Sequence, residues 1–254
     1  MGAGHGHALY VHEHSLVHHL APEAKVLAAF LFVLSVAITP REAVWGFAAY
    51  ALIVATVVGA SRVPPRFVLA RLLAILPFVV FALFLPFIGE GKDVEVLGVM
   101  VSGDGLWAMW NILAKATLGA TASILLAATT ETPDILKALN RLRVPAVITG
   151  IASFMIRYLE VVAGELGRMR TAMTARGYDP SWLGQARPIA SSAGTLFVRS
   201  YERGERVYEA MLARGYTGEM PTVRGAAATR RDWIISLSVP ISSWIVAIVS
   251  VIVT

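Results

Sequence analysis

The 254-residue sequence contains no cysteine and few charged residues. Without cysteine there are no disulfides and no thiolate chemistry. Charged residues make up 15% of the chain, against about 25% in an ordinary soluble domain. Apolar residues make up 56%, and the mean hydropathy is +0.65. Because the apolar residues occur in long runs, we expect lipid to be the main solvent of this chain.

Two further features are missing. No Gly-x-x-x-x-Gly-Lys-Ser/Thr loop is present to hold nucleotide phosphates, so we expect any ATP to be used by a partner. The first twenty residues are polar and histidine-rich, and they lack the apolar core of a cleavable signal peptide. We therefore expect the first apolar run to remain in the mature protein.

Five apolar runs are candidate membrane-spanning helices. They cover residues 26–39, 43–60, 67–88, 106–129 and 233–253. A helix that crosses the hydrocarbon needs about 20 residues, so the first run is too short to cross upright. We expect it to be tilted or partly re-entrant. Arg71 and Lys115 lie within two of the runs, and for both we favour a structural role, such as snorkelling or marking a span end, over a functional one.

The charges of the loops predict the orientation of the chain. Residues 62–66 are basic, whereas residues 90–104 hold four acids and one lysine. Positive loops stay in the cytoplasm, so the N-terminus is expected inside and the 90–104 loop outside. The chain after Thr129 is then cytoplasmic.

The region after Thr129 has a different composition. Residues 137–231 hold 15 of the 22 Lys and Arg residues, yet the region is still rich in apolar residues. This favours amphipathic helices at the cytoplasmic face. Proline and glycine divide the region into a short helix that begins at Thr132 and ends near Pro145, and long helices over about 146–176 and 189–214.

The sequence therefore predicts an all-α polytopic membrane bundle with long amphipathic cytoplasmic coupling helices. We divide it into a histidine-rich tail (1–20), transmembrane helices (21–130), a cytoplasmic region (131–225) and a C-terminal transmembrane helix (226–254).

Each long helix carries an apolar stripe with helical spacing. The stripes are Val162, Leu166, Met169 and Met173 in the first helix, and Phe197, Tyr201, Tyr208 and Met211 or Leu212 in the second. We interpret the stripes as surfaces for packing between helices or against lipid. Residues 146–163 are apolar enough to dip into the membrane, and Arg157 and Glu160, which are one turn apart, could pair there.

An internal repeat is the most informative motif. Residues 168–178 read RMRTAMTARGY and residues 206–216 read RVYEAMLARGY, with seven of eleven positions in agreement. One interpretation is a helix end used twice, because arginine suits the last turn and glycine suits a left-handed cap. A cap alone leaves the recurrence of Ala-Met and Tyr unexplained. We favour a second interpretation, in which Arg176 and Arg214 each reach a carboxylate on a partner protein.

The repeated ends resemble the two Ala-Arg-Gly motifs of the transmembrane (T) component of energy-coupling-factor transporters. The matching residues are Ala175, Arg176 and Gly177, then Ala213, Arg214 and Gly215. Residues 129–134 and 139–145 resemble the stretch that leads into the coupling helices of this family. Residues 154–158, with Glu165, are similar to the cobalt-type subunit CbiQ. The resemblance covers about residues 22–221.

The resemblance implies a non-catalytic coupling subunit in the bacterial inner membrane. Its partners would be two ATPase subunits, a CbiM-like substrate-binding membrane subunit (S component) and the lipid bilayer, with no nucleic acid. ATP and Mg would be bound by the ATPases, and no cofactor by this chain. Each Ala-Arg-Gly motif would dock on one ATPase, supported by Arg168, Met173, Arg206 and Met211. The transported ion would be cobalt or nickel.

All six histidines lie in the first nineteen residues. Neutral imidazole binds cobalt, nickel and zinc, so a metal-collecting tail is one interpretation and a solvated tail is the other. The weak candidate ligands are His5, His7, His12 and His14.

Three other functions stay open at this point. The chain could be a T component that serves vitamin-binding subunits. It could be a membrane enzyme that acts on lipid phosphates, although its cytoplasmic region has no histidine and no repeated catalytic spacing. It could also be an ordinary permease domain, although such a domain usually offers one coupling loop where this chain has two similar ends.

Overall fold

A computed structural model describes residues 10, 11, 13, 15–88, 93–96, 99–178, 187–218 and 228–253. The predicted all-α membrane fold is confirmed, with one short antiparallel hairpin in addition. The elements are α1 (Leu16–His19), α2 (Pro22–Ile38), α3 (Val44–Ser61), α4 (Pro65–Leu72), η2 (Leu73–Ile75), α5 (Leu76–Ile88), β1 (Asp93–Val96), β2 (Val99–Ser102), α6 (Gly103–Thr129), α7 (Thr132–Arg141), α8 (Ala146–Ala175), α9 (Arg187–Leu212) and α10 (Arg230–Val253).

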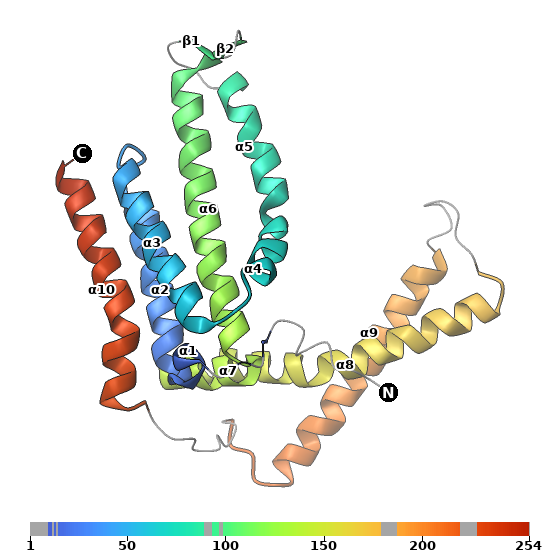
Figure 1. Cartoon of the computed structure of the whole chain (residues 1–254). Coiled ribbons are helices and arrows are strands. Elements are labelled where there is room, and N and C mark those ends of the chain that lie inside the picture. The colour runs from blue at the N-terminus through green and yellow to red at the C-terminus, as the bar shows by residue number, and fades with distance from the viewer. Residues whose placement is uncertain are drawn as a thin grey trace. The chain divides into compact units, whose positions relative to one another are not determined.

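The chain forms two compact units. The larger contains Leu9–Leu142 and Arg224–Thr254, and the smaller contains Arg143–Val223. Helix α7 packs against α2, so it belongs to the larger unit although the sequence placed it at the start of the cytoplasmic region. Within the larger unit, α2, α3, α6 and α10 form a bundle, and α5 runs beside α6 (Figure 1).

Helix α2 contributes much of the core of the bundle. Phe32 and Val36 are almost fully buried and pack with Phe47 and Tyr50 of α3. The rings of Phe32 and Tyr50 meet edge to face, with their centroids 5.9 Å apart. Because lipid is as apolar as these side chains, close packing rather than escape from water holds such helices together.

A buried hydrogen-bond chain links three helices of the bundle. The Tyr50 hydroxyl lies 2.8 Å from Thr39 Oγ1 and donates to the Ser243 carbonyl oxygen at 3.3 Å. Thr39 Oγ1 in turn donates to the Ser35 carbonyl oxygen at 2.9 Å. Polar groups without partners are costly in hydrocarbon, so this chain fixes α3 against α2 and α10.

Several predicted spans agree with the structure. Five helical segments of the described residues are long and apolar enough to cross a membrane: Val44–Ser61, Pro65–Ile88, Gly103–Thr129, Ala146–Ala175 and Arg230–Val253. The first predicted run forms α2, which at 17 residues is about 26 Å long and shorter than the hydrocarbon. The remaining qualifying segment is α8, which belongs to the region expected at the cytoplasmic face but includes residues 146–163, whose apolar sequence also suggested entry into the membrane.

The predicted span 67–88 is not one uniform helix. It consists of α4, a turn of 3-10 helix and α5. The outer surface of α5 is strongly apolar, and Phe78, Phe81, Phe84 and Phe87 are all exposed. On its inner side α5 approaches α6 closely at Gly105, where a Cβ would meet the Leu85 carbonyl oxygen and lie 2.8 Å from Pro86 Cα. Because glycine has no side chain, the backbones of α5 and α6 can come into contact at this point.

The two cations inside the predicted spans have structural partners. Lys115 Nζ donates to the Ala37 carbonyl oxygen at 2.8 Å and so caps the last turn of α2. The guanidinium of Arg71 lies 3.3 Å from the centroid of the Phe67 ring. Both contacts agree with the structural roles expected from the sequence.

Candidate functional site

In the smaller unit, α8 and α9 lie against each other and run in opposite directions (Figure 1). One carboxylate joins them near the middle. Glu165 of α8 is 7% exposed, and its two oxygens accept hydrogen bonds from Arg199 at 3.0 Å and Arg203 at 3.1 Å. Toward the C-terminal end of α8, the Ser192 hydroxyl lies 3.4 Å from Met173 Sδ.

The two Ala-Arg-Gly ends have the same backbone geometry. In the first, the Gly177 amide donates to the Thr174 carbonyl oxygen at 3.0 Å and the Tyr178 amide to that of Met173 at 3.1 Å. In the second, Gly215 donates to Leu212 at 2.9 Å and Tyr216 to Met211 at 3.0 Å. Gly177 and Gly215 have φ of +79° and +83°. This is a complete Schellman cap, built twice.

The cap explains more of the repeat than the sequence suggested. Its two outermost hydrogen-bonded residues are the recurring methionine and the recurring tyrosine, and apolar contact between these two positions commonly accompanies such a cap. The cap thus offers a reason for the recurrence of Met and Tyr that the sequence alone did not, while the side chain of the recurring alanine before the methionine makes none of its hydrogen bonds. Arg176 and Arg214 take part through their backbone amides. These amides donate to the Met173 and Met211 carbonyl oxygens, each at 3.0 Å, so the cap does not require an arginine side chain.

Both arginines are exposed. Within the described part of the chain, neither Arg176 nor Arg214 makes an ion pair or a side-chain hydrogen bond. Because α8 and α9 are antiparallel, the two arginines lie at opposite ends of the helix pair. Helix α9 has 26 residues and is about 39 Å long, so the two arginines are separated on that scale.

The predicted supporting residues occupy different positions. Met173 and Met211 accept the cap hydrogen bonds and are half-buried. Arg168 and Arg206 are exposed, one and a half to two turns before the cap. Arg206 lies 4.0 Å from Glu202 on its own helix, a weak surface pair.

The contact faces of α8 and α9 differ from the predicted stripes. In α8, Glu165 is buried and Leu166 is 50% exposed, so the face passes through Val162, Glu165, Met169 and Met173. In α9 the less exposed residues are Ser192, Leu196, Ser200, Arg203, Val207 and Met211. The predicted residues Phe197, Tyr201 and Tyr208 are mostly exposed. Their face is left for lipid or another protein. Arg157 and Glu160 do not pair in the described structure.

A cavity of about 440 Å³ lies between α8 and α9. Its walls include Met155, Tyr158, Val162, Tyr208 and Tyr216. Among the described residues that line it, there is no cluster of acids or histidines.

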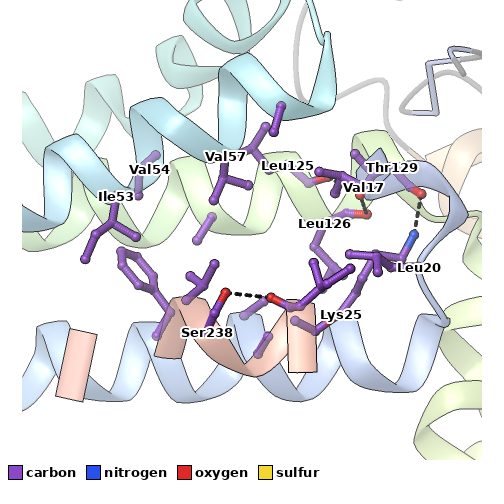
Figure 2. A pocket seen from close by; sticks show the side chains of 18 of the residues that line it. Val17, Leu20, Lys25, Ile53, Val54, Val57, Leu125, Leu126, Thr129 and Ser238 are labelled. Carbon is purple, nitrogen blue, oxygen red and sulfur yellow. Dashed lines mark hydrogen bonds between the residues drawn. The ribbon is translucent and has the colours of Figure 1, made fainter. Parts of the chain in front are cut away.

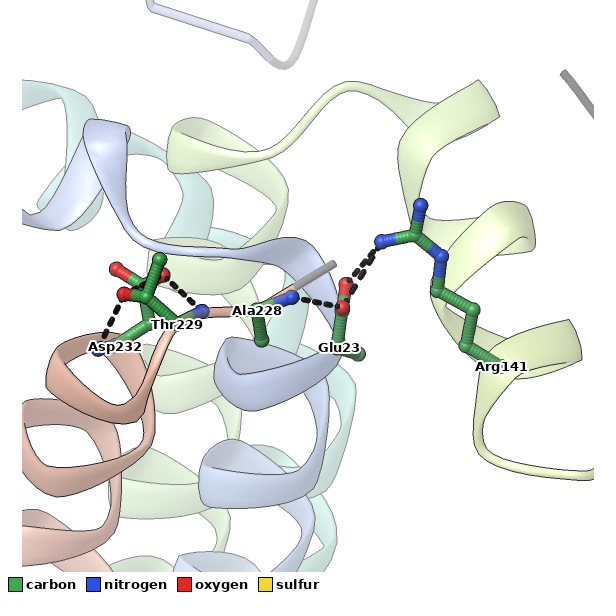
Figure 3. A network of polar contacts seen from close by, with 5 residues as sticks. All are labelled: Glu23, Arg141, Ala228, Thr229 and Asp232. Atoms are coloured by element: carbon green, nitrogen blue, oxygen red, sulfur yellow. Dashed lines mark hydrogen bonds and ion pairs between the residues drawn. The ribbon is translucent and has the colours of Figure 1, made fainter. Parts of the chain in front are cut away.

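A second polar network involves the residues that flank the smaller unit in sequence (Figure 3). Glu23 of α2 is 5% exposed. It accepts from Arg141 Nη1 at 2.9 and 3.1 Å and from the Ala228 amide at 3.0 Å. Arg141 ends α7, and Ala228 precedes α10. One carboxylate therefore binds the chain where it leaves the bundle and where it returns.

The start of α10 is fixed by a reciprocal cap (Figure 3). The Thr229 amide and hydroxyl donate to Asp232 Oδ2 at 2.8 and 2.7 Å, and the Asp232 amide lies 3.3 Å from Thr229 Oγ1. Such a pair satisfies amides that the first turn leaves free. The sequence analysis missed this cap and the role of Glu23, although Thr-x-x-Asp before an apolar run is a recognisable signal.

The four candidate metal ligands His5, His7, His12 and His14 lie outside the described residues. Among residues that are described, no group of three or more His, Asp or Glu side chains is placed to hold a metal ion. His18 is described and has a structural role. Its Nε2 donates to the Val11 carbonyl oxygen at 3.0 Å, so Nδ1 accepts from the Ser15 hydroxyl at 2.7 Å. Burial lowers the pKa of His18 below 6.5, which favours this neutral form.

The fold and these helix ends define a multi-pass membrane protein with paired, capped helices. A family model described as CbiQ, cobalt transport protein, matches residues 13–223. The chain belongs to this family of membrane transporter components.

Individual relatives agree with this assignment. The cobalt transport protein CbiQ of Rhodobacter capsulatus is 31% identical over 67% of this chain and 68% of its own length. The energy-coupling factor transporter transmembrane protein EcfT of Ruminiclostridium cellulolyticum is 24% identical over 93% of this chain and 94% of its own length. A putative fused cobalt transport protein CbiMQ of Methanocorpusculum labreanum is 27% identical over 43% of this chain, which spans 18% of the fused protein.

Proposed function

We propose that this chain is the non-catalytic T component of an ATP-driven energy-coupling-factor importer for cobalt or nickel. Arg176 and Arg214 are its contacts with two ATPase subunits. The observation that carries this proposal is the repeated helix end, in which an exposed arginine without a described partner sits on an identical cap at each end of one helix pair.

The chemistry of these ends suits an acidic socket on another protein. A guanidinium presents five donors in a rigid fork, which matches a carboxylate in two-point contact. Ala175 and Ala213 leave space beside each arginine, and Gly177 and Gly215 turn the backbone away from it. Two similar helix ends suit two similar acidic sites, as expected of a transporter with a pair of ATPase subunits.

The coupling mechanism follows from how the helices are held. When the ATPases close on nucleotide, their sockets move, and with them the ends of α8 and α9. Because Glu165 joins the two helices, they respond as a pair. Glu23 receives both connections to the bundle, so motion of the 143–223 unit acts on α2 and from there on the S component.

The metal substrate is supported by the family. The family is that of the cobalt transport protein CbiQ, and the fused relative is a putative cobalt transport protein, CbiMQ. We therefore propose a CbiM-like S component as the membrane partner, with the N-terminus of this chain in the cytoplasm of a bacterial inner membrane. Cobalt or nickel would be held by the S component and ATP with Mg by the ATPases, and the exposed aromatic face of α9 is available to the membrane partner.

The direct test is charge reversal at both ends. The double variant Arg176→Glu plus Arg214→Glu should leave the bundle folded but abolish copurification of the ATPases and ATP-dependent cobalt uptake. The matched control is Arg170→Glu plus Arg187→Glu, because these arginines are also exposed on α8 and α9 but are not among the seven positions that agree in the repeat. Normal uptake by the first double variant would refute the role of the two arginines.

A further inference from the structure

The larger unit contains an apolar cavity of about 310 Å³ among α2, α3, α6 and α10 (Figure 2). The walls are made mainly by aliphatic and aromatic side chains, including Phe32, Ile53, Val54, Val57, Leu125 and Val239. The volume is within the range of small-molecule sites. A cavity with such walls does not hold ordered water well, which favours an apolar occupant.

One end of the cavity carries a cation. Lys25 lines the cavity and is 8% exposed, and its Nζ donates to the Thr129 carbonyl oxygen at 2.7 Å (Figure 2). Within the described chain, no carboxylate lies within ion-pair distance of this ammonium group. Asp134 stabilises the charge of Lys25 from beyond ion-pair distance and is itself paired with Lys137. Because an ammonium has three donors and a buried charge without a close counter-ion is costly, Lys25 is complementary to an anion.

A second polar group in the cavity wall also lacks a partner. Ser236 of α10 is 5% exposed, and among the described residues its buried hydroxyl has no hydrogen-bond partner. Glu23 binds the Ala228 amide, which places the beginnings of α2 and α10 at the same level. Lys25 is two residues after Glu23, which is about 3 Å along α2. Ser236 is eight residues after Ala228, which is about 12 Å along α10.

We propose that this cavity binds an anionic phospholipid, with one acyl chain between the helices and the phosphate against Lys25. The order of groups along the cavity matches such a lipid. Lys25 lies nearest the helix ends, the Ser236 hydroxyl lies deeper, and the apolar walls lie beyond it. In the proposed complex the phosphate contacts Lys25, and an ester carbonyl of the lipid accepts a hydrogen bond from Ser236. A free phosphate would find the cation but would leave the long apolar part of the cavity empty.

The test uses the full chain in nanodiscs that contain phosphatidylglycerol and phosphatidylcholine with the same acyl chains. After extraction, native mass spectrometry should detect one retained phosphatidylglycerol per chain, favoured about tenfold over phosphatidylcholine. Lys25→Met should abolish this preference. Lys115→Met is the matched control, because Lys115 also donates to the carbonyl of a helix end but does not line the cavity.

A second variant and a competition complete the test. Ala60 lines the cavity and is exposed, so Ala60→Trp should obstruct the space without disturbing the core and should reduce retention of both lipids. Inorganic phosphate in excess should not displace the lipid. Equal retention of the two lipids, an unchanged preference in Lys25→Met, full retention in Ala60→Trp, or displacement by phosphate would each overturn the proposal.

Discussion

Glu23 and Arg141 form an ion pair in which one arginine nitrogen, Nη1, lies 2.9 and 3.1 Å from the two carboxylate oxygens. The Ala228 amide shares the same carboxylate at 3.0 Å. Residues 141 and 228 flank the segment that contains α8 and α9. Glu23 therefore binds residues on both sides of that segment.

We expect Glu23→Gln to destabilise the bundle by about 2 kcal/mol, because a largely buried charged hydrogen bond is lost and Arg141 loses its counter-ion. Glu42→Gln is the control, since Glu42 also binds an arginine, Arg41, but both are exposed, and its loss should cost about 0.5 kcal/mol or less. Thermal unfolding of the purified chain in detergent measures both. If the two variants lose the same amount of stability, the buried position of Glu23 gives it no special role.

Glycine to alanine substitutions should have opposite effects at two kinds of site. Gly177→Ala and Gly215→Ala should each weaken the helix end by about 1 kcal/mol, because both positions need a left-handed backbone. Gly167→Ala should stabilise α8 by roughly 0.5–1 kcal/mol, because Gly167 is helical and a Cβ there meets nothing within 4 Å. Amide hydrogen exchange in the last turn of each helix is the measurement. Slower exchange in Gly177→Ala would contradict the cap.

Glu165→Gln should loosen the pairing of α8 and α9, because Arg199 and Arg203 then lose their shared carboxylate. Since the chain has no cysteine, spin labels can be attached at two introduced cysteines, one in the middle of each helix. The distance distribution between them should broaden in Glu165→Gln. It should stay narrow in Glu160→Gln, the control, because Glu160 is exposed and unpaired in the described structure.

The His18 contact predicts a dependence on pH. The pKa of His18 is lowered by burial, so the unfolded chain binds the proton more tightly than the folded one. The contribution of His18 to stability is thus complete above about pH 6.5 and is lost as the pH falls through the lower pKa of the folded state. The Val11 amide donates to the Ala128 carbonyl oxygen at 3.0 Å, so this loss should release the segment before α1 from the end of α6.

Limited proteolysis between pH 8 and pH 5 measures the release of this segment. Cleavage before residue 15 should increase at low pH in the wild type. In His18→Gln, cleavage should no longer depend on pH, whereas His19→Gln should behave as the wild type does. A wild-type cleavage rate that is constant over this range would count against the assignment.

The sequence predicted the membrane bundle and the repeated helix ends well, because both depend on local signals. Long apolar runs and a glycine after a helix are readable without tertiary contacts. The stripe on α9 was compatible with packing against a helix or against lipid, and the sequence could not decide between them, because both surfaces carry apolar residues at helical spacing; in the structure Phe197 and Tyr201 lie off the face that packs on α8. Glu165 was recognised only by resemblance. Its ion-pair partners Arg199 and Arg203 are 34 and 38 residues further along the chain, so these pairs depend on tertiary packing and could not be predicted from local sequence.

The proposed function requires Arg176 and Arg214 to lie against the ATPase subunits when the transporter is assembled. Because the chain has no native cysteine, Arg176→Cys and Arg214→Cys can each be tested alone with a short thiol crosslinker against single cysteines introduced beside surface carboxylates of the proposed ATPase partners. We predict that each variant crosslinks to an ATPase subunit, with a yield that changes when nucleotide is added. If neither cysteine crosslinks and both react instead with a lipid-soluble thiol reagent, the arginines face the membrane and the proposed function is wrong.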